Sequence, residues 1–109
     1  MSRIILILED EPAILALLER ALESHGFQPA PCSGGDIPEV ALAAAVIDMS
    51  AAGDTAHELR RRHPRLPIIF ISGSPAAGNM PVPEPVHFLQ KPFLPQQLID
   101  LLVLLTAPV

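Results

Sequence analysis

The chain has 109 residues, half of them apolar, and carries a formal net charge of −5 at pH 7. This length suits one domain with a hydrophobic core of its own, which we expect to span residues 1–109. The acidic balance argues against a nucleic-acid-binding surface. The first apolar run is too short, and too closely followed by acidic residues, to be a signal peptide or a membrane span. The single cysteine, Cys32, cannot form an internal disulfide and fits a reduced cytoplasmic setting.

Apolar runs alternate with amphipathic segments in the first half of the chain. Residues 3–8 form a nearly continuous aliphatic run, typical of a strand buried on both faces. Residues 12–25 carry apolar side chains at helical spacing and end before Gly26, a frequent helix terminator. Residues 27–32 predict a second strand, whose two prolines favour an edge of the sheet. The segment 36–42 leaves room for one or two helical turns, or for an irregular connection.

The same alternation continues in the second half of the chain. Apolar runs at residues 43–47, 67–71 and 86–89 predict three more buried strands, and residues 55–63 and 95–106 predict helices. Strands that alternate with helices in this way are typical of an α/β domain. We therefore expect a five-stranded parallel sheet that is doubly wound.

The connection between the fourth and fifth predicted strands is rich in proline, with prolines at positions 75, 81, 83 and 85. Proline lacks an N–H donor and pushes the residue before it towards extended geometry. We therefore expect a fourth helix that is absent or only one turn long. The stretch 75–85 would instead run as an extended loop over the sheet.

Polar side chains follow the predicted strands at the point where each strand ends. Glu9 and Asp10 follow the first strand, Asp48 the third and Ser72 the fourth, and Lys91 comes soon after the fifth. The carboxyl ends of parallel strands meet at one edge of a sheet, where open α/β sheets bind their ligands. Carboxylates beside a lysine suit a hard cation and a phosphoryl group. The next residue, Glu11, is interpreted as structural, because the dipole of the helix that follows favours a negative charge at its start.

These residues resemble the receiver domain of two-component response regulators. The resemblance rests on four motifs in the family's order: Leu-Glu-Asp-Glu-Pro at 8–12, Val-Ile-Asp at 46–48, Ile-Ser-Gly at 71–73 and Leu-Gln-Lys-Pro-Phe at 89–93. It covers nearly the whole chain and implies a flavodoxin-like fold with strand order 2-1-3-4-5. The proline-rich stretch marks a variant with a degenerate fourth helix.

The resemblance implies a role for each residue of the site. Asp48 would accept a phosphoryl group from a histidine kinase or a phosphotransfer protein. Mg²⁺ would be bound by Asp10 and Asp48, by Glu9 largely through water, and by the backbone carbonyl of Ser50. Lys91 would pair with the phosphoryl oxygens. Such a chain is a phosphoprotein of a phosphorelay rather than an enzyme, at most catalysing its own phosphorylation and dephosphorylation.

The resemblance also implies two switch residues, Ser72 and Phe88. Two other positions, Ala52 and Ala56, depart from the family pattern. Ser72 resembles the switch hydroxyl that moves to the phosphate, and Phe88 the switch aromatic that changes rotamer with it. Ala52 and Ala56 stand where the family usually has a proline and a glycine. Because 109 residues leave no room for an effector region, we expect the output to be contact with a downstream protein target.

The last predicted helix, at 95–106, has apolar side chains around nearly its whole circumference, whereas a surface helix normally has a polar face. One interpretation is that it packs on a partner or on a second copy of the chain as a homodimer. The other is that the proline-rich stretch covers it. Neither interpretation involves nucleic acid or a membrane.

Two other polar features are interpreted as structural. The basic run at residues 60–63 lies at the end of a predicted helix, where the helix dipole favours cations. The four histidines are scattered and lack the spacing of metal ligands.

Two alternative functions remain beside the phosphoacceptor. The first is a phosphorylation-independent interaction module, favoured by the altered loop after Asp48. The second is a Mg²⁺-dependent phosphohydrolase for small substrates, which would need a second acid near the nucleophile. Met49 and Ser50 do not supply one.

Overall fold

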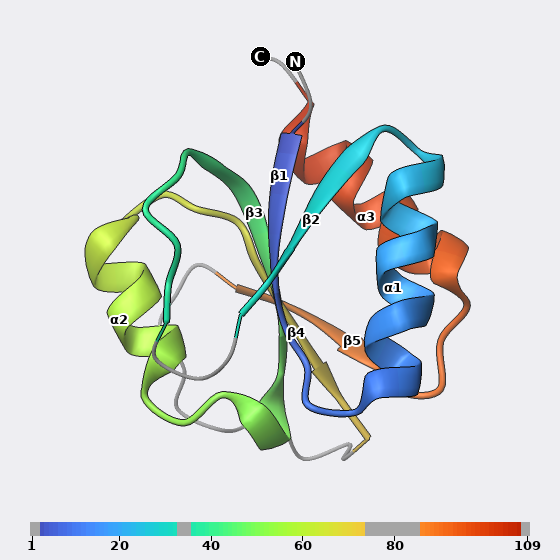
Figure 1. Cartoon of the computed structure of the whole chain (residues 1–109), viewed down its shortest axis with the longest axis horizontal. Coiled ribbons are helices and arrows are strands. Elements are labelled where there is room, and N and C mark those ends of the chain that lie inside the picture. Colours follow the sequence, from blue (N-terminus) through green and yellow to red (C-terminus); the bar gives the residue numbers. More distant parts are fainter. Residues whose placement is uncertain (1–2, 33–35, 74–85, 108–109) are drawn as a thin grey trace.

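The computed structural model of the chain describes residues 3–32, 36–73 and 86–107, and these form one five-stranded parallel sheet. The strands are β1 (Arg3–Leu8), β2 (Phe27–Pro31), β3 (Leu42–Asp48), β4 (Ile68–Ser72) and β5 (Val86–Gln90). Their order in the sheet is β2-β1-β3-β4-β5, which confirms the predicted fold class (Figure 1). The proline-bearing strand β2 lies at an edge, as predicted from its missing N–H donors.

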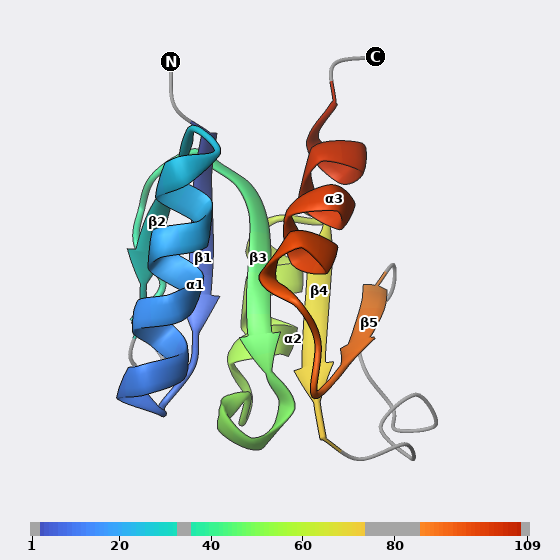
Figure 2. The ribbon, with the colours of Figure 1, turned by 90° about the vertical axis from the view of Figure 1, so that its right-hand side faces the viewer.

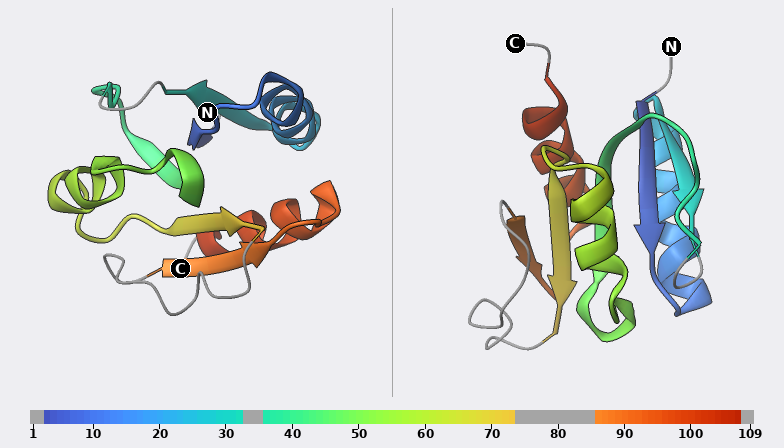
Figure 3. Two further views of the ribbon diagram at one scale, coloured as in Figure 1. Left: turned by 90° about the horizontal axis from the view of Figure 1, so that it is seen from below. Right: turned by 90° about the vertical axis from the view of Figure 1, so that its left-hand side faces the viewer.

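Helices cover both faces of the sheet. The structure has α1 (Pro12–Ser24), the 3₁₀ helix η1 (Met49–Ala51), α2 (Thr55–Arg62) and α3 (Pro95–Thr106). Helices α1 and α3 lie together on one face and α2 lies on the other (Figure 2, Figure 3). A prolyl residue occupies the first turn of both α1 and α3, where its missing N–H costs nothing. None of the helices in the described ranges is long and apolar enough to cross a membrane.

Two hydrophobic clusters, one on each face, hold these layers together. Alternate residues of β1 point to opposite faces, so that Ile5 and Ile7 contact the α1 and α3 side while Leu6 and Leu8 contact the α2 side. All four side chains are almost fully buried. This explains why the strand sequences show no polar alternation.

The connection between β2 and β3 is irregular in its described part. Residues 36–41 form no helix, so of the two expected forms the structure shows the irregular one. Ile37 of this segment is buried in the cluster on the α2 face and so contributes to the core without a helix. The predicted loss of the fourth helix falls on residues 75–85, which lie outside the described residues.

The register of the sheet brings the functional ends of the strands level with one another. Leu8 pairs with Ile47, so the residues that follow them, Glu9 and Asp48, emerge side by side. Ser72 of β4 pairs with Gln90 of β5, which places Lys91 at the same edge. This edge is formed by the arrowheads of β1, β3 and β4 in Figure 2.

Candidate functional site

An ion-pair cluster occupies the carboxyl-terminal edge of the sheet. The Nζ atom of Lys91 lies 2.6 Å from Oδ2 of Asp48 and 3.9 Å from Oε2 of Glu9. The carboxylates are almost completely buried, with side chains 6% exposed for Asp48 and 2% for Glu9, and Lys91 is 27% exposed. A contact of 2.6 Å between an ammonium and a carboxylate is a charge-assisted hydrogen bond. Three residues far apart in the sequence therefore form one compact charged site.

The backbone around Lys91 directs its side chain towards Asp48. The Lys91–Pro92 peptide bond is cis. The backbone N–H of Lys91 donates a 2.7 Å hydrogen bond to the carbonyl of Ser72, the last residue of β4. The end of β5 is thus joined to the end of β4, and the lysine side chain crosses the edge of the sheet to reach β3.

Ser50 holds the other oxygen of Asp48. Its backbone N–H donates to Oδ1 of Asp48 at 2.8 Å, and its hydroxyl donates to the same atom at 2.7 Å. Asp48 thereby caps the 3₁₀ helix η1. The resemblance implied a role only for the backbone carbonyl of Ser50. An aspartate side chain often accepts a hydrogen bond from the backbone N–H two residues later, and that pattern could have indicated the backbone contact.

The buried carboxylates of Glu9 and Asp48 have opposite pKa shifts. Burial and the adjacent Asp48 carboxylate raise the pKa of Glu9 from its usual 4.5 to about 7, against a smaller opposite effect of Lys91. Burial also acts to raise the pKa of Asp48, but interaction with Glu9 and the hydrogen bonds from Lys91 and Ser50 outweigh it and hold that pKa well below its usual range. The hydrogen bond with Asp48 raises the pKa of Lys91. Near neutral pH, Asp48 and Lys91 are therefore charged, and Glu9 is poised to bind a proton or a cation.

One polar atom of the site has no hydrogen-bond partner. Oε2 of Glu9 is buried and accepts no hydrogen bond, because Nζ of Lys91 at 3.9 Å is beyond hydrogen-bond range. A second carboxylate, that of Asp48, lies beside it, and the single lysine does not compensate both charges. An orphaned buried carboxylate oxygen next to another carboxylate suits a small divalent cation.

The described residues hold no group of three or more acidic, histidine or cysteine side chains gathered closely enough to form a ready-made metal site. Mg²⁺ does not require such a cage, because it is commonly held by one or two carboxylates together with waters and phosphate oxygens. Glu9 and Asp48 fit that mode. Asp10 is exposed at the start of the loop, and its role as a metal ligand stays a prediction.

The two predicted switch residues lie next to the cluster. Ser72 ends β4 and contacts Lys91 through its backbone. Phe88 lies on β5 directly opposite Phe70, and the two rings stack with their centroids 5.8 Å apart. Phe70 is buried whereas Phe88 is 38% exposed, so one face of the Phe88 ring is in contact with the core and much of the rest is open to solvent. The structure thus places both residues on the strands that carry the site.

Comparison with solved structures identifies the fold. The chain is similar to a response regulator receiver protein from Sinorhizobium medicae, with 28% identity over 96% of this chain and 94% of that one and a TM-score of 0.82. A sensor protein from Polaromonas is also 28% identical, with 95% of each chain covered and a TM-score of 0.78. The receiver domain of a sensor histidine kinase from Pseudomonas aeruginosa, crystallised with a magnesium ion coordinated in the active site cleft, is 20% identical over 99% of this chain and all of that domain, with a TM-score of 0.85.

No protein-family model matches the sequence, and no match is found among curated proteins. The structural similarity nevertheless covers nearly the whole chain. The fold is that of a response regulator receiver domain, as the sequence motifs indicated. The 28% identity with the receiver protein from Sinorhizobium medicae supports a receiver-domain role in two-component signalling.

Proposed function

We propose that this chain accepts a phosphoryl group on Asp48 from a histidine kinase or a phosphotransfer protein and thereby switches a surface that contacts a downstream protein. The observation that carries the proposal is the 2.6 Å contact between Lys91 and a buried, ionised Asp48 beside the unpaired Glu9. Phosphoryl transfer depends mainly on positioning and charge neutralisation, and this cluster supplies both.

The chemistry follows from the contacts of Asp48. Oδ1 accepts two hydrogen bonds from Ser50 and Oδ2 accepts one from Lys91, so both oxygens are held in place. Oδ2 is the proposed nucleophile, because the ammonium beside it can pass to the phosphoryl oxygens. Oδ2 forms a bond to the phosphorus of a phosphohistidine while the P–N bond breaks, and the departing imidazole nitrogen keeps the electron pair of that bond. The product is an acyl phosphate whose phosphoryl oxygens stay beside the ammonium of Lys91.

The proposal includes Mg²⁺ as the cation of the site. Glu9 and Asp48, together with Asp10 and the carbonyl of Ser50, are the residues that we propose to hold it. When bound, Mg²⁺ would neutralise phosphoryl charge that Lys91 alone leaves uncompensated. The buried, unpaired oxygen of Glu9 supports this assignment.

The switch is proposed to pass through Ser72 and Phe88. A phosphoryl group adds negative charge and acceptor oxygens next to Ser72. Lys91 and Ser72 are already connected through the backbone, and Phe88 lies two residues before Gln90, the strand partner of Ser72. A shift of the Ser72 hydroxyl towards the phosphate would therefore change the contacts of the half-exposed Phe88 ring and bias two pre-existing surfaces.

Intact-protein mass spectrometry tests the phosphoacceptor directly. We expect that incubation with Mg²⁺ and acetyl phosphate adds the mass of one phosphoryl group, and that Asp48→Asn abolishes this adduct because an amide oxygen is a poor nucleophile. Asp54→Asn is the matched control, since Asp54 is exposed and its side chain makes no capping hydrogen bond.

Other results would select another function. The absence of an adduct, together with no binding of beryllofluoride, would favour the phosphorylation-independent interaction module. Rapid turnover of many phosphate esters would favour the hydrolase.

The proposed homodimer through α3 has support in the exposure of its apolar side chains. Leu104 is 72% exposed and Val103 50% exposed. Burying such side chains in an interface is favourable. In analytical ultracentrifugation we expect the sedimentation coefficient to rise with protein concentration, and we expect Leu104→Glu to abolish this rise. Leu17→Glu, at an exposed leucine of α1, is the matched control. A monomer at every concentration would contradict self-association.

A further inference from the structure

The basic side chains of the protein are concentrated at one end. Four of the seven lysines and arginines lie within residues 60–65, which leaves three basic residues against twelve acidic ones elsewhere. This segment ends α2 and leads into β4, so it lies at the amino-terminal edge of the sheet, opposite the Asp48 site. Because β3 runs from one edge to the other over seven residues, the two ends are about 20 Å apart.

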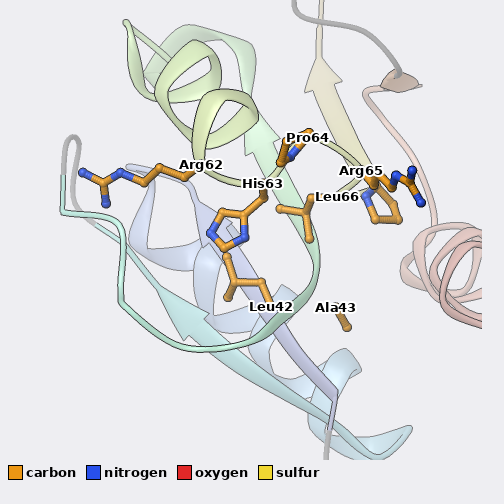
Figure 4. A pocket seen from close by; sticks show the side chains of 8 residues that line it. Leu42, Ala43, Arg62, His63, Pro64, Arg65 and Leu66 are labelled. Carbon is orange, nitrogen blue, oxygen red and sulfur yellow. The ribbon is translucent and has the colours of Figure 1, made fainter.

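A hollow of about 500 Å³ opens at this basic end. Its lining combines apolar side chains of Leu42, Leu66 and Pro67 with the polar side chains of Arg62, His63 and Arg65. In Figure 4 the His63 ring faces Leu42, and the two arginines extend to opposite sides of this apolar centre. The hollow therefore has an apolar floor with an arginine, Arg62 or Arg65, on each side.

The arginines of the segment differ in how many hydrogen bonds and ion pairs they already form within the chain. Arg60 donates hydrogen bonds to the backbone carbonyls of His63 and Pro64 and so completes the end of α2. Arg61 forms a bidentate ion pair with Glu58, and Nε of Arg62 lies 3.2 Å from the same carboxylate.

Arg65 is exposed and forms no ion pair with any carboxylate in the described parts of the chain. The helix dipole accounts for cations in the last turn of α2, but Arg65 lies beyond that turn. Together with the terminal nitrogens of Arg62, its guanidinium is available to a partner.

The chemistry of the hollow selects the kind of partner. An anion must carry the complementary charge, and an apolar group must fill the floor between the arginines. Apart from the His63 ring, which faces Leu42, the lining contains no aromatic ring on which a nucleobase could stack. An extended phosphate backbone would run beyond the hollow and meet the strongly acidic remainder of the chain, whereas a short peptide segment would stay on the basic residues.

We propose that the hollow bounded by Leu42, Leu66, Arg62 and Arg65 binds an acidic peptide segment of a partner protein, with one aliphatic side chain on the floor and carboxylates on the two arginines. This site is separate from the phosphoacceptor. It gives the protein a second contact surface at the opposite end of the sheet.

Amide NMR spectra of the isotope-labelled protein test this site. The probe is the peptide acetyl-Glu-Asp-Leu-Asp-Glu-amide, titrated at low salt with no phosphodonor present, so that the result is independent of the function proposed for Asp48. We expect peak shifts confined to residues 42–43 and 60–67, and an affinity that falls as salt is added. Replacing the leucine of the peptide by serine should weaken binding, because the floor is then left without an apolar group.

Matched charge reversals locate the contact. We expect Arg65→Glu to weaken binding of the peptide about tenfold or more. Arg20→Glu changes the net charge equally, at an exposed position on α1, and should change the affinity by less than about twofold, a nonspecific charge effect.

Four outcomes would overturn the proposal. The first is the absence of amide peak shifts at millimolar peptide. The second is an equal loss of affinity in Arg65→Glu and Arg20→Glu. The third is equally strong displacement by inorganic phosphate, which would indicate a simple anion site. The fourth is tighter binding of a single-stranded oligonucleotide than of the peptide, which would indicate a nucleic-acid surface.

Discussion

Replacing Lys91 by methionine is expected to lower the free energy of unfolding by about 3 kcal/mol at about pH 8, since breaking a largely buried ion pair leaves a charge uncompensated. The same variant should form the Asp48 adduct about 100-fold more slowly, because one preorganised cation is lost from the transition state. Methionine keeps the length and the apolar stem of the lysine. The effect therefore reports the ammonium group and its contacts with Asp48 and Glu9.

The stability loss caused by Lys91→Met is expected to depend on pH. Without Lys91, the two carboxylates face each other in a buried site, and protonation relieves their repulsion. The loss of stability should therefore shrink as the pH is lowered towards about 4, where carboxyl groups take up protons. Urea unfolding at both pH values measures this.

Arg20→Met is the control, because it removes the same charge from the exposed face of α1. A cost for Lys91→Met no larger than that of the control would mean that the ion pair contributes nothing to stability.

Replacing Glu9 by glutamine is expected to stabilise the protein by about 2 kcal/mol at about pH 8. The pKa of Glu9 is raised from its usual 4.5 to about 7 in the folded state. The folded state therefore binds the proton more tightly than the unfolded state, and stability falls as the pH rises between these two values. Above the folded pKa the full cost of the buried charge is present. Glutamine carries no charge and removes that cost.

Asp48 contributes with the opposite sign in a different pH window. Its pKa is lowered in the folded state, so its stabilising contribution is present above its usual pKa and is lost as the pH falls further. The fall in stability between about pH 5 and pH 7 therefore belongs to Glu9, and Glu9→Gln should remove it.

Glu11→Gln removes the same charge at an exposed neighbouring glutamate and should leave the fall unchanged. A Glu9→Gln variant that is less stable than the native protein at pH 8, or that keeps the slope, would contradict the assignment.

Comparison of the native protein with Glu9→Gln also tests binding of Mg²⁺. A cation that binds only the folded state stabilises it by mass action. Added MgCl₂ should therefore stabilise the native protein at pH 8 more than it stabilises Glu9→Gln, because the variant lacks one of the proposed ligands. This readout depends on unfolding alone and needs no phosphodonor.

The alternation of buried strands and helices was predictable from local patterns. All five strands were predicted to within a residue at each end, four of them from mainly apolar runs and β2 from its place between Gly26 and the turn that follows it. The last helix was predicted with its observed bounds, Pro95–Thr106. Local patterns were less informative between β2 and β3. There the burial of Ile37, a tertiary contact, replaces the stabilisation that a regular helix would provide.

The sequence by itself determined which chemical groups stand at the strand ends, because the position of a residue directly after a buried run can be seen in the chain. Glu9, Asp48, Ser72 and Lys91 were all selected on that basis, and the structure brings them to one edge of the sheet. Their proposed roles in phosphoryl transfer stay predictions.

Only the tertiary structure decided how these groups divide the charge. Two adjacent carboxylates are chemically similar. Their depth, the distance to Lys91 and the hydrogen bonds from Ser50 lower the pKa of Asp48 and raise that of Glu9 to about 7, so Glu9 is about half protonated at pH 7. The hollow between Leu42 and Leu66 is likewise invisible in the chain. The physical reason is common to both: burial and distance between side chains depend on strand pairing across many residues, which no local pattern encodes.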